Sequence, residues 1–211
     1  MGPILHSIQT PYVDAQTLLT LLSEYRKPRE WILRMVKKGH LIRLKNGFYL
    51  IEDKIKRELH SWIPYEQIAN LLYGPSYVSL EWALSFYGMI PERVYSLTSM
   101  TLGSHKEYNT PIGTFTYDNL SLKRYSIGIT QKPSMHSIGN FLIATPEKAL
   151  VDWIFKTCKG FNKTMLKTDI LESKRMNVDS IRQLDKNLLM EIAESYRAKI
   201  VDELVNVIGI L

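Results

Sequence analysis

The sequence predicts an α+β protein: an N-terminal winged helix-turn-helix, then a C-terminal mixed α/β domain with a small antiparallel sheet flanked by helices. Three observations support this. Helical apolar spacing fills the first 40 residues, and an Asn-Gly turn between two strand-like runs follows it. Further strand-like runs then alternate with helical segments, and the last third is helical. The chain has 211 residues, so we expect two domains, at 1–53 and 61–211.

The N-terminal segment carries helix signals in a fixed order. Residues 3–9 predict a short helix that ends at Thr10-Pro11. Asp14 can cap a second helix, because a carboxylate accepts hydrogen bonds from the free N–H groups of a first turn. Pro28 suits the first position of a third helix, and Gly39 is a good terminator because glycine tolerates positive φ.

A hairpin follows the third helix. Residues 41–45 and 48–51 are strand-like, and Asn46-Gly47 between them favours a type I′ turn with positive φ at both residues. Three helices and a hairpin form a winged helix, whose third helix enters the major groove of DNA while the hairpin contacts the backbone or the minor groove.

Basic residues are concentrated in this segment. Residues 1–60 hold 11 Lys and Arg against 6 Asp and Glu, and residues 26–45 hold eight basic residues against Glu30 alone. Such a patch is typical of nucleic-acid binding, although a solvated basic surface or a winged helix used for protein contacts would show it too. The predicted DNA-binding residues are Arg26, Lys27, Arg29, Arg34, Lys37, Lys38, Arg43, Lys45 and Asn46. We expect Arg34 to reach a base edge and Lys45 to meet a phosphate of duplex DNA.

The rest of the chain predicts the second domain. Residues 52–60 are charged and predict a linker. Helices are expected at 64–73, from Ser79 to Gly88, and from a start at Thr145-Pro146-Glu147. Strands are expected at 94–100, 110–117, 122–129 and 138–144. From Thr164 onward the pattern is helical, with breaks near Asn177, Asp185 and Ser195.

Motifs for catalysis, cofactors and metals are missing from the sequence. It has no glycine-rich phosphate loop, nucleophile elbow or paired-histidine metal motif. Cys158 lies near Lys156 and Lys159, which could lower its thiol pKa, but an inert thiol is the simpler interpretation. We therefore expect a protein that is not an enzyme and has no cofactor or metal. A single cysteine, no apolar run of about 20 residues and no secretory signal predict a cytoplasmic protein without membrane contact.

Three segments go beyond pattern: residues 77–88 (YVSLEWALSFYG), 110–117 (TPIGTFTY) and 143–152 (IATPEKALVD). Their order and spacing closely resemble the AbiEi antitoxins of bacterial type IV toxin–antitoxin (abortive infection) systems. Gly39 and Gly47-Phe48-Tyr49 resemble that family's recognition helix and wing. Trp31 and Leu33 depart from it, because similar proteins usually carry small polar residues there. Either the helix is rotated or these side chains meet thymine methyl groups.

The resemblance implies a transcriptional repressor that binds repeats in its own promoter and antagonises an AbiEii-like nucleotidyltransferase toxin, with direct contact left open. We also expect a monomer in solution, with cooperative binding on DNA left open. Among the shared positions, Glu81, Glu147, Lys148 and Asp152 are the candidates for an antitoxic surface. Two other hypotheses remain: a solitary winged-helix regulator with a ligand-sensing or assembly domain, and an enzyme whose C-terminal domain covalently modifies the toxin or its substrate. We expect the two activities to separate near residues 52–60.

Overall fold

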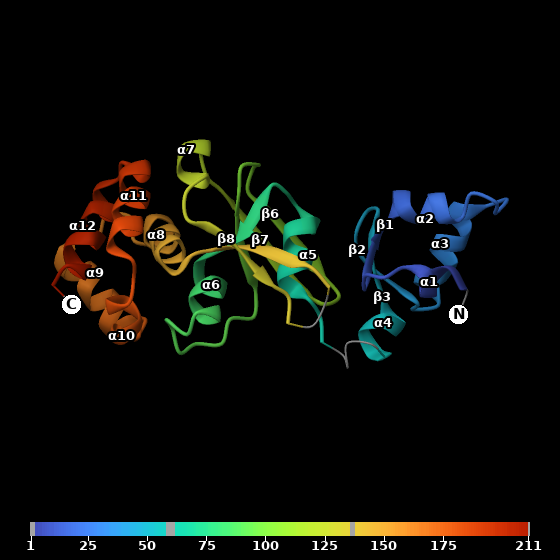
Figure 1. Ribbon diagram of the computed structural model, residues 1–211, viewed down its shortest axis with the longest axis horizontal. Helices are drawn as coiled ribbons and strands as arrows, with labels where there is room; N and C mark the ends of the chain where they lie inside the picture. Colours follow the sequence, from blue (N-terminus) through green and yellow to red (C-terminus); the bar gives the residue numbers. More distant parts are fainter. Residues whose placement is uncertain (1–2, 58–61, 136–137, 211) are drawn as a thin grey trace.

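The computed structural model of the chain describes residues 3–57, 62–135 and 138–210. Three parts follow one another along its longest axis (Figure 1). The N-terminal helices and a three-stranded sheet form one end, a six-stranded sheet forms the middle, and a cluster of C-terminal helices forms the other end. The fold is therefore mixed α and β, in agreement with the α+β prediction.

The N-terminal part follows the predicted order of helices and hairpin. It comprises α1 (Pro3–Ser7), β1 (Tyr12–Asp14), α2 (Ala15–Leu21), α3 (Pro28–Lys37), β2 (Leu41–Lys45) and β3 (Phe48–Ile51). The predicted signals lie at the helix ends: a carboxylate oxygen of Asp14 accepts a hydrogen bond of 2.7 Å from the backbone N–H of Thr17, Pro28 occupies the first turn of α3, and Gly39 has φ +76°. Strand β1 was not predicted.

The prediction of a type I′ turn between β2 and β3 is wrong. Gly47 has φ +77°, whereas Asn46 is not among the residues with positive φ. The strand register shifts between Arg43 and Lys45, so that Lys45 pairs with Phe48. An irregularity in β2 thus provides the extra twist that a second positive φ would otherwise supply. The backbone N–H of Ala15 donates to the carbonyl of Gly47 at 2.7 Å, which ties the turn to the start of α2.

The three-stranded antiparallel sheet, in the order β1-β3-β2, forms a middle layer. On one face, Leu41, Tyr49 and Ile51 join a core cluster with the N-terminal helices. On the other, Phe48 and Leu50 belong to the core cluster of the rest of the chain. Every residue of β3 is buried because alternate side chains enter different cores.

A helix, α4 (Glu52–Arg57), follows β3 where a linker was predicted. Ile55 and Lys54 are buried in it, so this half of the expected linker is ordered structure. Residues 58–60 of the expected linker lie outside the described residues. The expected division into domains at 1–53 and 61–211 stays a prediction.

The middle part is built on a six-stranded sheet in the order β6-β7-β5-β4-β9-β8. The strands are β4 (Ser76–Val78), β5 (Leu97–Thr101), β6 (Lys106–Thr110), β7 (Gly113–Asn119), β8 (Ile129–Pro133) and β9 (Asn140–Ala144), and the accompanying helices are α5 (Tyr65–Leu72) and α6 (Leu80–Phe86). The prediction of a small antiparallel sheet is wrong: β5 runs parallel to β7, and β4 runs parallel to β9. Each parallel pair joins strands separated by other elements, which local patterning does not reveal.

Two predicted strands also differ from the structure. The expected strand at 110–117 is split by Pro111 and Ile112 into the hairpin of β6 and β7. The expected strand at 122–129 is replaced by the short helix α7 (Leu122–Tyr125), and β8 begins only at Ile129.

The C-terminal helices pack beyond the sheet. They are α8 (Pro146–Thr157), α9 (Lys163–Thr168), the π-helical turn η1 (Asp169–Ser173), α10 (Val178–Arg182), α11 (Lys186–Tyr196) and α12 (Lys199–Ile208). The predicted cap of α8 is confirmed, because the hydroxyl of Thr145 accepts from the backbone N–H of Lys148. Asn177 and Asp185 cap α10 and α11 as the predicted breaks require. Among the described residues, no helix is long and apolar enough to cross a bilayer.

Candidate nucleic-acid interface

Helix α3 divides into a buried face and an exposed basic face. Trp31, Ile32 and Met35 are buried against the N-terminal core. Arg29, Leu33, Arg34 and Lys37 are exposed, together with Glu30. These positions recur at three- and four-residue spacing, so they lie along one side of the helix. The end of α3 therefore presents positive charge to solvent.

A hollow of about 630 Å³ separates α3 from the hairpin. Arg29 and Leu33 line it from α3, and Arg43, Asn46 and Gly47 line it from the hairpin. Two of the predicted basic residues and both predicted turn residues thus meet around one concave surface. The two guanidinium groups give this surface positive charge, which is what a contact with a phosphate backbone requires, while Ala15, Leu19, Ile32, Leu33 and Tyr49 add apolar lining.

The remaining predicted residues differ in how free they are. Arg26, Lys38 and Arg34 are exposed, and none of them has an ion pair among the described residues. Lys27 is exposed but forms an ion pair with Glu30 at 2.8 Å, which offsets part of its charge.

Lys45 faces away from the hollow. It is half-buried, and its Nζ donates a hydrogen bond to the carbonyl of Leu72 at the end of α5. Burial lowers the pKa of Lys45 below its usual value. This corrects the expectation that Lys45 meets phosphate from a wing tip, because the irregular register of β2 turns it toward the middle part of the molecule. The residues at that tip are Asn46 and Gly47.

The structure shows different environments for Trp31 and Leu33, the two apolar residues at positions where AbiEi antitoxins usually carry small polar ones. Trp31 is a core residue, in edge-on contact with the ring of Tyr25. Leu33 is 60% exposed and borders the hollow. The apolar character of Trp31 thus serves packing, and only Leu33 is placed where it can touch a ligand.

Three of the four residues expected at an antitoxic surface are buried. Lys148 and Asp152 are 0% exposed, and Glu147 is 6% exposed. This corrects the expectation of an exposed surface. Glu147 accepts a hydrogen bond from the backbone N–H of Asp185, and Glu81, which is half-buried, accepts one from the indole N–H of Trp153. Both carboxylates therefore join helices to one another.

Lys148 and Asp152 form the centre of a buried polar cluster. Their Nζ and Oδ1 atoms are 3.5 Å apart, one helical turn from each other on α8. Asp152 also accepts hydrogen bonds from the hydroxyls of Tyr77, Ser79 and Tyr196, and Lys148 donates to the Tyr196 hydroxyl at 2.7 Å. Burial lowers the pKa of Lys148, and the nearby Asp152 opposes that shift. The cluster connects β4, α6, α8 and α11.

This cluster has the properties of a structural centre. Each of its charged groups is paired and hydrogen-bonded, as buried charges require. Burial, reinforced by the Asp152 charge, raises the pKa of the Tyr196 hydroxyl well above its ordinary value, so the phenol stays a proton donor. Burial likewise raises the pKa of the Cys158 thiol, which favours the protonated thiol over the reactive thiolate. Within the part of the chain that the structure describes, no group of His, Cys, Asp and Glu side chains could hold a metal ion.

Comparisons with known proteins support a shared overall fold and nothing more specific. No family model matches the chain, and no curated protein matches it. The structure resembles the crystal structure of the RV2827C protein from Mycobacterium tuberculosis with a TM-score of 0.54. The two chains are 12% identical, and the match covers 94% of this chain and 72% of that one. The two proteins therefore share an overall fold.

Proposed function

We propose that the N-terminal part is a winged helix that binds duplex DNA through the exposed face of α3 and the hollow beside the hairpin. The observation that carries this proposal is the convergence of Arg29 and Arg43 on one hollow, flanked by Arg34 and Lys37 on the same helix. A recognition helix and a wing contact DNA from the two sides of such a hollow. Arg43 replaces Lys45 as the basic residue of the wing in this proposal.

The position of this surface supports the proposal. Helix α3 lies at one end of the molecule, on the far side of the three-stranded sheet from the middle part (Figure 1). Besides α3, only α2 of the described helices borders the hollow, through Ala15 and Leu19, and no described helix of the middle part or of the C-terminal end lines it. Arg34 lies mid-helix and reads a base edge, whereas Arg29 and Arg43 contact phosphates on either side of the hollow.

Binding to the DNA upstream of the chain's own gene tests the proposal. Affinity should fall between about 50 and 200 mM salt, with a log–log slope of about −0.9 for each phosphate contacted. Lys37→Ala and Lys186→Ala each remove one positive charge, but Lys186 is exposed at the start of α11, at the other end of the molecule. Only Lys37→Ala should reduce the slope, by about one contact. Equal effects of the two substitutions, or an affinity that does not respond to salt, would refute the proposed face.

A further pair of variants separates base reading from phosphate contact. Arg34→Ala should cost roughly 1–3 kcal/mol on the specific site and relax preference at one base pair. Arg43→Ala should weaken specific and random DNA alike, because a phosphate contact carries no sequence information. If both substitutions weaken all sequences equally, α3 does not read bases.

We also propose that the chain is an antitoxin and autorepressor of a type IV toxin–antitoxin system. This rests on the resemblance of residues 77–88, 110–117 and 143–152 to AbiEi antitoxins. Because Lys148 and Asp152 are buried, the toxin-antagonising surface in this proposal consists of other, exposed residues of the middle part and the C-terminal helices. A solitary winged-helix regulator remains the alternative.

Gene neighbourhood and growth rescue distinguish these functions. An antitoxin gene should lie beside a gene for a nucleotidyltransferase-like protein, and co-expression of the two should restore growth that the neighbour alone arrests. To separate antagonism from repression, the toxin is expressed from an unrelated promoter. Rescue by a chain carrying Arg34→Ala and Lys37→Ala would then support an antagonism that is independent of DNA binding. Growth arrest by the neighbour that this chain never relieves would refute the antitoxin function.

A further inference from the structure

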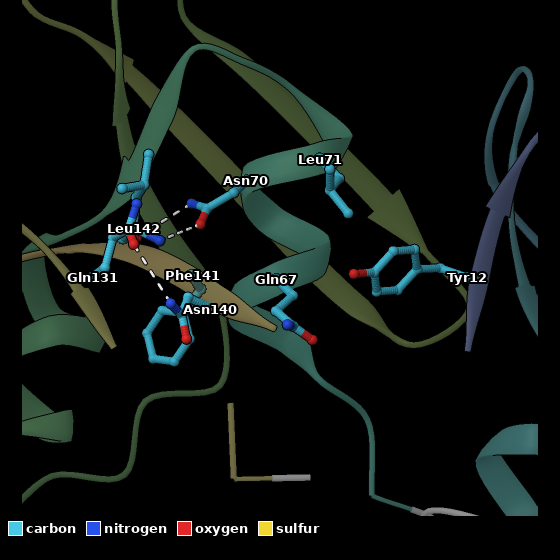
Figure 2. Close-up of a pocket in the computed structure, with 8 residues that line it drawn as sticks. All are labelled: Tyr12, Gln67, Asn70, Leu71, Gln131, Asn140, Phe141 and Leu142. Carbon is cyan, nitrogen blue, oxygen red and sulfur yellow. Dashed lines mark hydrogen bonds between the residues drawn. The ribbon is translucent and has the colours of Figure 1, made fainter. Parts of the chain in front are cut away.

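A pocket of about 200 Å³ lies where β1 of the three-stranded sheet faces α5, β8 and β9 (Figure 2). Two leucines line it, together with four side-chain amides and two aromatic rings: Gln67, Asn70, Gln131, Asn140, Tyr12 and Phe141. None of the lining side chains is a carboxylate, ammonium or guanidinium group. The pocket is therefore polar but uncharged.

Three of the four amides are engaged in holding the wall of the pocket. The Asn70 Nδ2 donates to the carbonyl of Leu142 at 3.3 Å, and its Oδ1 accepts from the backbone N–H of Leu142 at 2.6 Å. The Asn140 Nδ2 donates to the Gln131 Oε1 at 3.5 Å. These bonds fix α5 against β9 and β9 against β8, so the pocket is preformed (Figure 2).

Gln67 is the exception among the amides. It is 3% exposed, its Nε2 donates to the carbonyl of Ile138 at 3.0 Å, and its Oε1 has no hydrogen-bond partner among the residues that the structure describes. A flipped amide would place two oxygens against each other at Ile138, so the orientation is fixed by chemistry. An unpaired buried acceptor costs about 1–3 kcal/mol, which makes it a place where a donor gains affinity.

Tyr12 provides a second polar group across the pocket. Its hydroxyl points from β1 toward the helix that carries Gln67 and Asn70 (Figure 2). The structure gives this hydroxyl no hydrogen-bond partner among the residues it describes. An acceptor on helix α5 and a hydroxyl on strand β1 thus face the same small space.

We propose that this pocket binds a small, uncharged, planar molecule of nucleobase size that carries an N–H group beside a carbonyl or ring nitrogen. The N–H donates to the Gln67 Oε1, and the adjacent acceptor receives the Tyr12 hydroxyl. The ligand is uncharged because no lining group would compensate a buried charge. It is planar because the walls include the rings of Tyr12 and Phe141. It is small because drug-sized ligands need about 300 Å³ or more.

Titration of the full chain with uracil, cytosine and nicotinamide tests this proposal, with the side-chain amide signals of an isotope-labelled protein as the readout. At least one probe should bind at up to about 10 mM and shift the Gln67 signals. For uracil, 1,3-dimethyluracil is the matched control, since it keeps the ring and carbonyls but has no N–H donor. It should bind at least tenfold more weakly.

Two variants locate the site. Gln67→Met removes the acceptor at nearly constant length and should weaken binding roughly tenfold. Gln183→Met, at an exposed position after α10, should leave binding unchanged. Leu71→Trp places a large ring at the rim from a half-exposed position and should block binding, which keeps the test decisive if the Gln67 variant is unstable. No binding by any of the three probes, equal binding of uracil and its dimethyl analogue, or undiminished binding by Leu71→Trp would overturn the proposal.

Discussion

The three-stranded sheet should make the N-terminal part dependent on the rest of the chain. A fragment of residues 1–57 keeps every N-terminal helix and the hairpin, but it exposes the sheet face that carries Leu44, Phe48 and Leu50. These side chains are 6%, 7% and 0% exposed in the whole chain. Burying one such side chain stabilises a fold by about 1.5–3 kcal/mol, so the fragment loses about 5–9 kcal/mol. Whole domains are stable by only about 5–15 kcal/mol.

We therefore expect the fragment to be largely unfolded or aggregated, where the sequence predicted a separable DNA-binding unit. Circular dichroism during thermal unfolding and size-exclusion chromatography measure this. The matched fragment with Leu44→Thr, Phe48→Thr and Leu50→Thr should be more soluble, because threonine keeps strand propensity and removes the apolar face. The same three substitutions should destabilise the full chain. A wild-type fragment that is monomeric and unfolds at the temperature of the full chain would refute this reasoning.

Three more predictions concern the interior. Lys148→Met should lower the free energy of unfolding in urea by about 3–5 kcal/mol, because it leaves Asp152 buried without its counter-charge, whereas Lys186→Met at an exposed site should change it little. Gly128→Ala should destabilise by more than about 1 kcal/mol, since φ is +78° and an added Cβ would lie 2.8 Å from side chains of Ile192 and Lys148; a neutral result by calorimetry would contradict the packing. Burial raises the pKa of Tyr117 above its ordinary 10.0, so the folded chain holds a proton that the unfolded chain releases. Stability should therefore fall as pH rises above 10.0, and Tyr117→Phe should flatten that fall in unfolding curves measured at several pH values.

Local chemistry explains which elements the sequence predicts correctly. Asp14 and Thr145 mark helix starts because their side chains accept hydrogen bonds from backbone N–H groups of the first turn. Pro28 marks one because it lacks the N–H group that would be unpaired at that position. Gly39 marks the end of α3 because glycine adopts a positive φ, here +76°, without steric strain. By contrast, the parallel pairing of β5 with β7 depends on residues far apart in the chain, and β1 is too short to show alternation.

The buried cluster shows why the candidate site was partly misplaced. Lysine and aspartate are rarely fully buried, so a surface position is the default expectation for Lys148 and Asp152. Their spacing of four residues is the signal that they pair on one helix face. Ala149, Leu150 and Val151 between them are all buried, and a helix that is apolar on the remaining sides is an interior helix. The pattern thus contained evidence for a core position, but not for which hydroxyls would meet the carboxylate.

The composition of Phe48–Ile51 also indicates burial, and this bears on the two proposed binding sites. Four consecutive apolar residues in a strand indicate burial on both faces, as in sheets covered on two sides. The hairpin that borders the candidate DNA-binding hollow therefore also packs against the middle part of the molecule. Tyr12, which lines the pocket between β1 and α5, pairs with Leu50 in the central strand of that sheet. A ligand held between Tyr12 and Gln67 would touch the sheet whose opposite edge carries Arg43. DNA and the pocket ligand would be thermodynamically coupled only if the affinities of both depend on the position of that sheet against α5.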